Sequence, residues 1–239
     1  MPSESLARAD TAVGRMTVTR RAVERIKAMI ADGTLHPGQR LPTERELAAG
    51  MGLSRSSMRE AIRVLTTLGV LEARHGAGVY VTELRPRDLL EPFSVLAEIS
   101  RGRTLLEVVQ VRRIVEPAAT ALAAVHATDR QLGELAALLE RADGEGEAAA
   151  ADAAFHRAVA AMSGNATLAA VVDGLSSPAF GARVWPGRQE EGMVERLRAD
   201  HRRIHRALLS RDPDAARAAA TLHVLELEDW LRARLSDFS

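Results

Sequence analysis

The sequence predicts a mainly α-helical protein, in which an N-terminal unit of helices and one β-hairpin precedes an all-α helical bundle. Three observations predict this fold class. Of the 239 residues 46% are hydrophobic but only 3% are aromatic, so Ala, Leu and Val build a core that favours packed helices over a β-sandwich. Apolar residues recur at helical spacing along most of the chain. Two short β-like runs lie between residues 70 and 81.

The composition excludes several classes of site. The chain has no cysteine, which rules out disulfides, thiolate metal sites and thiol nucleophiles. No apolar run is long enough for a membrane span, and the first residues lack a signal-peptide core, so we expect a soluble, cytoplasmic protein. The 32 basic and 32 acidic residues cancel, yet residues 1–85 carry 13 of the basic and only 9 of the acidic ones. Such an asymmetry suggests that the N-terminal end faces nucleic acid.

The first 85 residues divide into a polar tail, three helices and a hairpin. Residues 1–15 lack apolar periodicity and are expected to be a flexible tail. Thr43, with Glu46 three residues later, forms the capping box of the second helix, and Ser54 is the N-cap of the third. The predicted helices cover residues 17–31, 44–50 and 54–69, and the predicted strands cover 70–73 and 79–81.

The spacing of Ala48, Gly52 and Met58 predicts how the second and third helices meet. A small residue lets the helices approach, a glycine takes the left-handed conformation of the turn, and an apolar residue packs between the helices. Three helices with this turn and a following hairpin have the outline of a winged helix-turn-helix, here at residues 16–83. An ordinary helical hairpin is the alternative.

The third predicted helix has an apolar stripe on one side and basic residues on the other. Arginine is the usual bidentate partner of guanine, while hydroxyl groups bind phosphate. A merely solvated basic face is the alternative, but arginines four residues apart on a helix repel each other. We therefore expect DNA contacts from this helix, the preceding helix and the hairpin tip, through Arg45, Arg55, Ser56, Arg59, Arg63, His75 and Gly76.

Three segments of this unit carry a family pattern. They are Pro37-Gly38-Gln39-Arg40-Leu41-Pro42-Thr43-Glu44-Arg45-Glu46-Leu47-Ala48, then Leu53-Ser54-Arg55-Ser56-Ser57-Met58-Arg59-Glu60-Ala61, and Leu68-Gly69 with His75-Gly76-Ala77-Gly78. Together they resemble the signature of GntR-superfamily transcriptional regulators over residues 17–82. The resemblance implies a winged helix-turn-helix DNA-binding domain, with DNA contacts from Arg45, Ser54, Arg55, Ser56, Arg59, His75 and Gly76.

Beyond a linker at Arg85-Pro86-Arg87, the sequence is nearly all helical. Apolar periodicity predicts helices at 88–101, 104–125, 128–142, 147–163, 165–180, 191–210 and 213–236. The Gly/Pro-rich stretch at 174–192 interrupts this pattern. We therefore expect a linker and first helix at 84–99, followed by an all-helical domain at 100–236.

Arg112 lies on the inward face of its predicted helix, together with Val108, Val115 and Ala119. An unpaired buried guanidinium costs roughly several kcal/mol, so Arg112 requires an anionic partner. Glu116, four residues further on, is one candidate. The carboxylate of a bound effector is the other, and the residues alone leave both open.

Four residues of the helical domain have the character of metal ligands. Asp152 and His156 are four residues apart and share a helix face, where a carboxylate and an imidazole can bind one ion. His201 and His223 each lie within an apolar stripe of a later helix. His205 is a rival to His201, whereas the histidines that fall in or near turns are poorer candidates, namely His36, His75 and His126.

The helical domain also carries a family pattern. Its segments are Val109-Gln110-Val111-Arg112-Arg113-Ile114-Val115-Glu116-Pro117, Asp152-Ala153-Ala154-Phe155-His156 with Ser163-Gly164-Asn165, His201-Arg202-Arg203-Ile204, and His223. They resemble the FCD-type ligand-binding domain of the FadR subfamily over residues 100–232. The resemblance implies a metal site made of Asp152, His156, His201 and His223. Asn165 can instead be a helix cap.

These features predict a ligand-responsive, sequence-specific DNA-binding regulator, most simply a repressor, with no catalytic residues. A homodimer would read a palindromic double-stranded operator, because a two-fold protein matches a two-fold site. The helical domain would hold a divalent metal, zinc first with nickel or manganese as alternatives, and a small carboxylate effector between the metal and Arg112. Two alternatives remain: a regulator that senses the ion itself, and a metal-dependent hydrolase.

Overall fold

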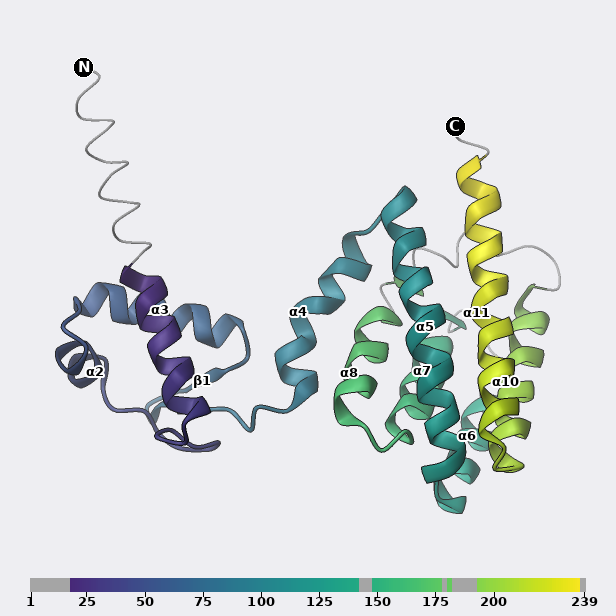
Figure 1. Cartoon of the computed structure of the whole chain (residues 1–239), viewed down its shortest axis with the longest axis horizontal. Helices are drawn as coiled ribbons and strands as arrows, with labels where there is room; N and C mark the ends of the chain where they lie inside the picture. The colour runs from purple at the N-terminus through teal and green to yellow at the C-terminus, as the bar shows by residue number, and fades with distance from the viewer. Residues whose placement is uncertain (1–17, 142–147, 178–179, 182–192, 237–239) are drawn as a thin grey trace. The chain divides into compact units, whose positions relative to one another are not determined.

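A computed structural model of the chain describes residues 18–141, 148–177, 180–181 and 193–236 (Figure 1). The chain divides into two compact units, Met1–Leu89 and Leu90–Ser239, and each is taken by itself below. The expected tail at 1–15 and most of the Gly/Pro-rich stretch at 174–192 lie outside the described residues. The predicted fold class, mainly helical with one small hairpin, is confirmed.

The N-terminal unit combines helices with a two-stranded sheet. It contains a helix at 18–31, α2 (Glu44–Gly50), α3 (Arg55–Thr67), β1 (Leu71–Arg74) and β2 (Gly78–Val81). The strands are antiparallel, with Leu71 opposite Val81. These two residues are buried together with Ile26, Leu47 and Met58, so every element of the unit contributes to one core.

The helix starts of this unit follow from local sequence. The Thr43 side chain accepts a hydrogen bond from the Glu46 amide, and Glu46 Oε2 accepts one from the Thr43 amide at 2.8 Å, which confirms the capping box. Ser54 Oγ accepts from the Ser57 amide at 3.1 Å and begins α3. Gly52 has a φ of +63°, so the predicted left-handed turn between α2 and α3 is also confirmed.

The C-terminal unit is a helical bundle. Its helices are α4 (Pro86–Ile99), which begins in the N-terminal unit, α5 (Gly102–His126), α6 (Asp129–Arg141), α7 (Ala148–Ala161), α8 (Ala166–Leu175), α10 (Met193–Leu209) and α11 (Pro213–Ser236). The long helices α5 and α11 lie side by side, and α5 also contacts α7, α8 and α10 (Figure 1). The central position of α5 allows its inward residues to reach several other helices.

Two of the differences between observed and predicted helix ends have a local cause. The helix α4 begins at Pro86, inside the expected linker, because proline is well suited to the first position of a helix. The helix α8 ends at Leu175 rather than near residue 180. The hydroxyl of Ser177, two residues beyond that end, accepts a hydrogen bond from the Phe180 amide at 3.2 Å, and serines that bond to nearby backbone in this way are favoured at helix boundaries rather than inside helices.

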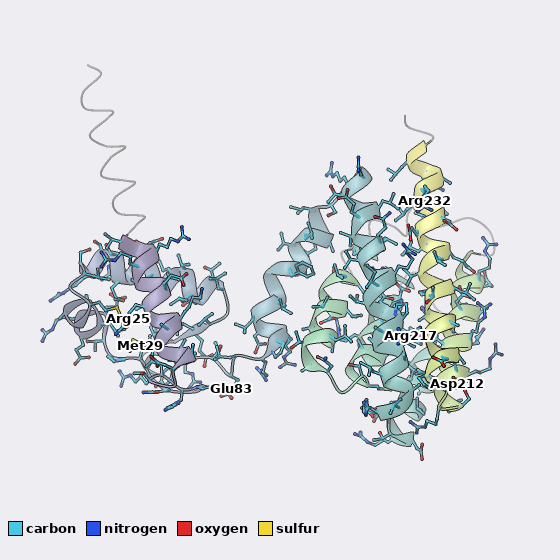
Figure 2. All side chains as sticks on the ribbon, viewed as in Figure 1. Arg25, Met29, Glu83, Asp212, Arg217 and Arg232 are labelled. Atoms are coloured by element: carbon cyan, nitrogen blue, oxygen red, sulfur yellow. The ribbon has the colours of Figure 1, made fainter. Side chains whose placement is uncertain are left out.

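Polar caps and side-chain packing complete the bundle. Asp212, labelled in Figure 2, precedes α11, and its Oδ1 accepts hydrogen bonds at 3.0 Å from the amides of Asp214 and Ala215. Asn165 caps α8 in the same way, accepting from the Leu168 amide at 3.0 Å. Among the described residues, no helix is both long and apolar enough to span a membrane.

Candidate metal centre and nucleic-acid interface

The bundle brings together four potential metal ligands from three helices. Asp152 and His156 lie on α7, His201 on α10 and His223 on α11, and one ligand atom of each lies within 4.8 Å of the others. His156 Nε2 lies 3.2 Å from His223 Nε2 and 3.5 Å from Asp152 Oδ1. His201 Nε2 lies 3.3 Å from the same Asp152 oxygen. The three histidines are buried, and the Asp152 side chain is 13% exposed.

These separations fit a single bound cation. In tetrahedral coordination with bonds of about 2.0–2.2 Å, neighbouring ligand atoms are about 3.3–3.6 Å apart. Three of the separations between ligand atoms, at 3.2–3.5 Å, are close to that range, and the other pairs lie within 4.8 Å. Two buried imidazole nitrogens that face each other can share only one proton, whereas a cation accepts both lone pairs. The donor set of three nitrogens and one oxygen therefore suits a divalent metal ion.

The residues of this cluster differ in their affinity for protons. Burial alone would lower the pKa of His156, but the carboxylates of Glu116 and Asp152 outweigh it and raise the pKa to about 9. Burial lowers the pKa of His201 to about 4, even though Asp152 opposes the shift. Burial would raise the pKa of Asp152, but His156 and His201 hold it well below its usual range. In the absence of metal these neighbours favour the imidazolium form of His156, and a bound cation would take the place of its Nε2 proton.

An aromatic ring holds one of the histidines in place. Phe155 stacks on His201, with ring centroids 4.0 Å apart and an interplanar angle of 17°. Phe155 is itself buried in the bundle core. His205, the rival to His201, lies apart from the cluster, and its Nε2 is 3.1 Å from the carbonyl oxygen of Leu132.

Arg112 lies close to this cluster and is 1% exposed. Its Nε donates to Oε1 of Glu116, so the partner four residues away is engaged. The guanidinium also stacks over the Phe180 ring, 4.8 Å from its centroid. Arg112 Nη1 is nevertheless buried and has no hydrogen-bond partner among the described residues. Arg112 thus has both an internal partner and a donor left for a bound anion.

The N-terminal half of α3 presents polar groups to solvent. Arg55, Ser56 and Arg59 are exposed, as is Arg45 on α2. Ser54 Oγ serves as the helix cap and also lies 3.0 Å from Ser56 Oγ. An exposed serine pair at a helix N-terminus can donate to a phosphate without loss of the cap.

One ion pair links the two helices of the turn. Arg59 Nε lies 3.0 Å from Oε2 of Glu44, and both side chains are at least one-third exposed. Exposed pairs contribute little to stability and are screened by salt. Arg59 can therefore exchange Glu44 for a phosphate or a base edge at little energetic cost.

The hairpin tip is accessible. His75 and Gly76 are both exposed between β1 and β2. Gly76 has a φ of +68°, and apart from its chain neighbours no atom of the described residues lies within 4 Å of the position that a Cβ would occupy. The tip is therefore free to approach a groove of DNA closely.

Comparison with known proteins identifies both units. Residues 18–81 match the bacterial regulatory proteins of the gntR family, and residues 107–226 match the FCD domain. The chain is 31% identical over 214 residues to the HTH-type transcriptional regulator LutR of Bacillus subtilis (strain 168), which covers 85% of this chain and 96% of LutR. The protein belongs to the GntR family.

Two further relatives agree with this assignment. The Glc operon transcriptional activator of Escherichia coli (strain K12) is 31% identical over 84% of each chain. A solved structure of Streptococcus agalactiae GntR is 25% identical, has a TM-score of 0.61 and covers 88% of this chain and 99% of its own. This GntR-family protein is therefore a DNA-binding transcriptional regulator and not an enzyme, so the alternative of a metal-dependent hydrolase is set aside.

Sequence reasoning missed several polar neighbours of the cluster in this regulator. Glu116 was considered only as a partner of Arg112, yet its Oε2 also lies 3.0 Å from Nδ1 of His156. Ser176, just after α8, donates to Glu116 Oε1 at 3.0 Å. Asp200 is buried next to His201 in sequence, and its Oδ2 lies 3.7 Å from Nδ1 of His223. These contacts join different helices, so no spacing within one helix reveals them.

Proposed function

We propose that this GntR-family regulator binds a palindromic operator as a homodimer, and that a divalent metal with a small organic acid controls this binding. Repression in the absence of the acid is the simplest form of control. The observation that carries the proposal is the convergence of Asp152, His156, His201 and His223 beside the buried Arg112.

The donor set supports a borderline metal ion at these four residues. Imidazole nitrogens suit zinc, nickel and copper, and a carboxylate also accepts manganese. Zinc is the first candidate, with nickel or manganese as alternatives. When bound, the ion would act as a Lewis acid that attracts a carboxylate oxygen. Arg112 Nη1, which is buried and unpaired among the described residues, would bind the other end of the same anion.

The DNA-binding part of the proposal rests on exposed groups of the N-terminal unit. Arg55 and Arg59 would reach base edges in the major groove, and Ser54 and Ser56 would bind phosphate. Arg45 would contact the backbone from α2. His75 and Gly76 would enter the neighbouring minor groove.

An apolar stripe on α5 supports pairing with a second copy of the chain. Val111, Ile114, Leu122 and Val125 are exposed by 41%, 70%, 37% and 60% and lie on one side of the helix. Exposed apolar stripes of this kind mark protein interfaces. A second copy is the partner that a palindromic operator requires. Ile114→Asp is expected to produce monomers in analytical ultracentrifugation, and an unchanged oligomeric state would contradict this assignment.

The effector changes DNA binding only if it has different affinities for two arrangements of the protein. A coupling free energy of ~1–3 kcal/mol would change operator affinity by roughly 5- to 150-fold. Elemental analysis of the purified protein, followed by operator-binding titrations with metal and organic acids added separately, tests the proposal. The proposal would be refuted if the protein contained no metal, or if its operator affinity changed with neither the metal nor any organic acid.

One observation favours a second candidate, a regulator in which the ion itself is the signal. A cavity lined by Glu116, Thr120 and His156 together with apolar side chains measures about 10 Å³, which is room for no more than a water molecule. Operator affinity that changes with metal alone, and not further with any carboxylic acid, would favour this candidate.

A further inference from the structure

We infer that Glu116 is a positioning residue that prepares both halves of the proposed effector site, since it orients the ligand His156 and the anion-binding Arg112 at the same time. The inference rests on the proposed metal site and adds Glu116 to it, although Glu116 is not itself one of the four ligands.

The two oxygens of the Glu116 carboxylate have different partners. Oε2 lies 3.0 Å from Nδ1 of His156 on α7. Oε1 accepts from Nε of Arg112 on the same helix and from Oγ of Ser176 at 3.0 Å. Glu116 is 3% exposed, and its partners are buried as well. A carboxylate enclosed in this way has no solvent-facing alternative, so its orientation is determined by these contacts.

The contact with His156 determines which nitrogen is offered to a metal. Because Nδ1–H of His156 donates to Oε2 of Glu116 and keeps its proton, the lone pair available for coordination is that of Nε2. Nε2 is the atom that points at the other ligands, 3.2 Å from His223 Nε2 and 3.5 Å from Asp152 Oδ1. A carboxylate on the far nitrogen of a ligating histidine fixes the tautomer and the ring orientation, and its loss typically costs about 10–100-fold in metal affinity.

The contact with Arg112 determines which donors remain for an anion. Glu116 engages Nε, and the guanidinium plane rests on the Phe180 ring. Nη1 is then left buried without a hydrogen-bond partner among the described residues. A single carboxylate therefore explains why the metal ligand and the anion donor are both held ready in one buried cluster.

Zinc affinity of the full chain, measured by competition with a chromogenic chelator after the metal has been stripped, tests the inference. We expect Glu116→Ala to weaken zinc binding about 10–100-fold and Glu116→Gln to weaken it less, because the amide oxygen still accepts from Nδ1. Glu228→Gln is the matched control. Glu228 is 2% exposed and, like Glu116, is a buried carboxylate paired with arginine, here Arg113 and Arg232, but among the described residues no ion pair or hydrogen bond joins it to a histidine. Its zinc affinity should equal that of the wild type.

A second readout separates positioning from general stability. In the zinc-loaded wild type, ¹⁵N NMR of labelled histidine should show His156 protonated at Nδ1 and bound through Nε2, and Glu116→Ala should alter these shifts. If Glu116 variants do not fold, Ser176→Ala removes one contact to the same carboxylate, and it should weaken zinc binding a few-fold.

The outcomes distinguish this inference from the proposed function. A wild type that binds no zinc would refute the metal site itself. Wild-type zinc binding that His156→Ala abolishes, but that Glu116→Ala and Ser176→Ala leave unchanged, would overturn only the role of Glu116. Equal losses of zinc affinity in Glu116→Ala and Glu228→Gln would also overturn the role of Glu116, because the effect would then follow from the loss of any buried carboxylate.

Discussion

The two units of the protein present their functional side chains in opposite ways. In the N-terminal unit, Arg55, Ser56 and Arg59 are exposed on one helix and its first turns. In the C-terminal unit, His156, His201 and His223 are buried and come from three helices. The first arrangement would keep the proposed DNA contacts separate from stability, whereas the second would make the proposed ligand binding and stability depend on the same residues.

The largest expected effect is the loss of the metal. His156→Ala combined with His223→Ala removes two of the four ligands, so the protein should contain no bound metal by elemental analysis. Binding to non-specific DNA should remain, because it depends on the other unit. Full metal content in the double variant would show that the cluster is not the site. His205→Ala, which changes a histidine outside the cluster, should retain the metal.

Removal of the buried arginine is expected to have the next largest effect. Arg112→Ala leaves Glu116 buried without its main cation and should lower the free energy of unfolding by about 3–5 kcal/mol. Urea unfolding followed by circular dichroism measures it. Arg130→Ala removes a similar i,i+4 pair whose arginine is 80% exposed, so no measurable change is expected there. Equal changes in the two variants would contradict the contrast between buried and exposed charges.

The stability of the metal-free protein should decrease on both sides of pH 6.5. The pKa of His201 is lowered to about 4, so the unfolded state binds more protons between pH 4 and 6.5 and stability falls as the pH drops. The pKa of His156 is raised to about 9, so its contribution is present below pH 6.5 and is lost as the pH rises to 9. For each proton by which the folded and unfolded states differ, the free energy of unfolding changes by ~1.4 kcal/mol per pH unit.

Unfolding of chelator-treated protein between pH 4 and 9 measures this profile. In His156→Asn the alkaline decrease should disappear, whereas the acidic decrease should remain. A wild-type profile that is flat from pH 6.5 to 9 would mean that His156 is not held as an imidazolium by its two carboxylate neighbours.

Arg55→Ala tests the exposed unit. Loss of one bidentate base contact should weaken specific operator binding by ~1–3 kcal/mol, with little change in melting temperature. Arg103→Ala on α5 is a matched control, because its side chain is 91% exposed and pairs only with Glu107 among the contacts described. If Arg55→Ala leaves the affinity for the operator and the affinity for random DNA both unchanged, Arg55 does not read a base.

The smallest effect concerns the turn before α3. Gly52 has a φ of +63°, so Gly52→Ala should destabilise the N-terminal unit by about 1 kcal/mol, although in the described part of the chain only its sequence neighbours lie within 4 Å of the added Cβ. Gly133→Ala on α6 is the opposite control, because that glycine lies in a helix without a positive φ and has equally open surroundings. It should stabilise the protein by about 0.5–1 kcal/mol. Thermal denaturation measures both variants: the melting temperature should fall in Gly52→Ala and rise in Gly133→Ala.

Local patterns predicted the N-terminal unit almost completely. The Thr43–Glu46 capping box, the Ser54 cap and the Gly52 turn all depend on residues within four positions of one another, and each is found as expected. The same holds for the cap of α8 by Asn165. At Pro86 and Ser177, where helix ends differ from the prediction, the cause is also local: a proline that can begin a helix and a hydroxyl that accepts a nearby backbone amide.

The sequence by itself predicted the two units, most of their helices, the candidate DNA-contacting residues and the four potential metal ligands, because propensity, capping and periodicity act between near neighbours. Only the tertiary structure decided how these ligands meet and which groups surround them. Glu116 faces both Arg112 and His156, and Asp200 approaches His223, only because α5, α7, α10 and α11 pack together. Helix packing sets these distances between residues far apart in the chain, and no spacing along a single helix encodes them.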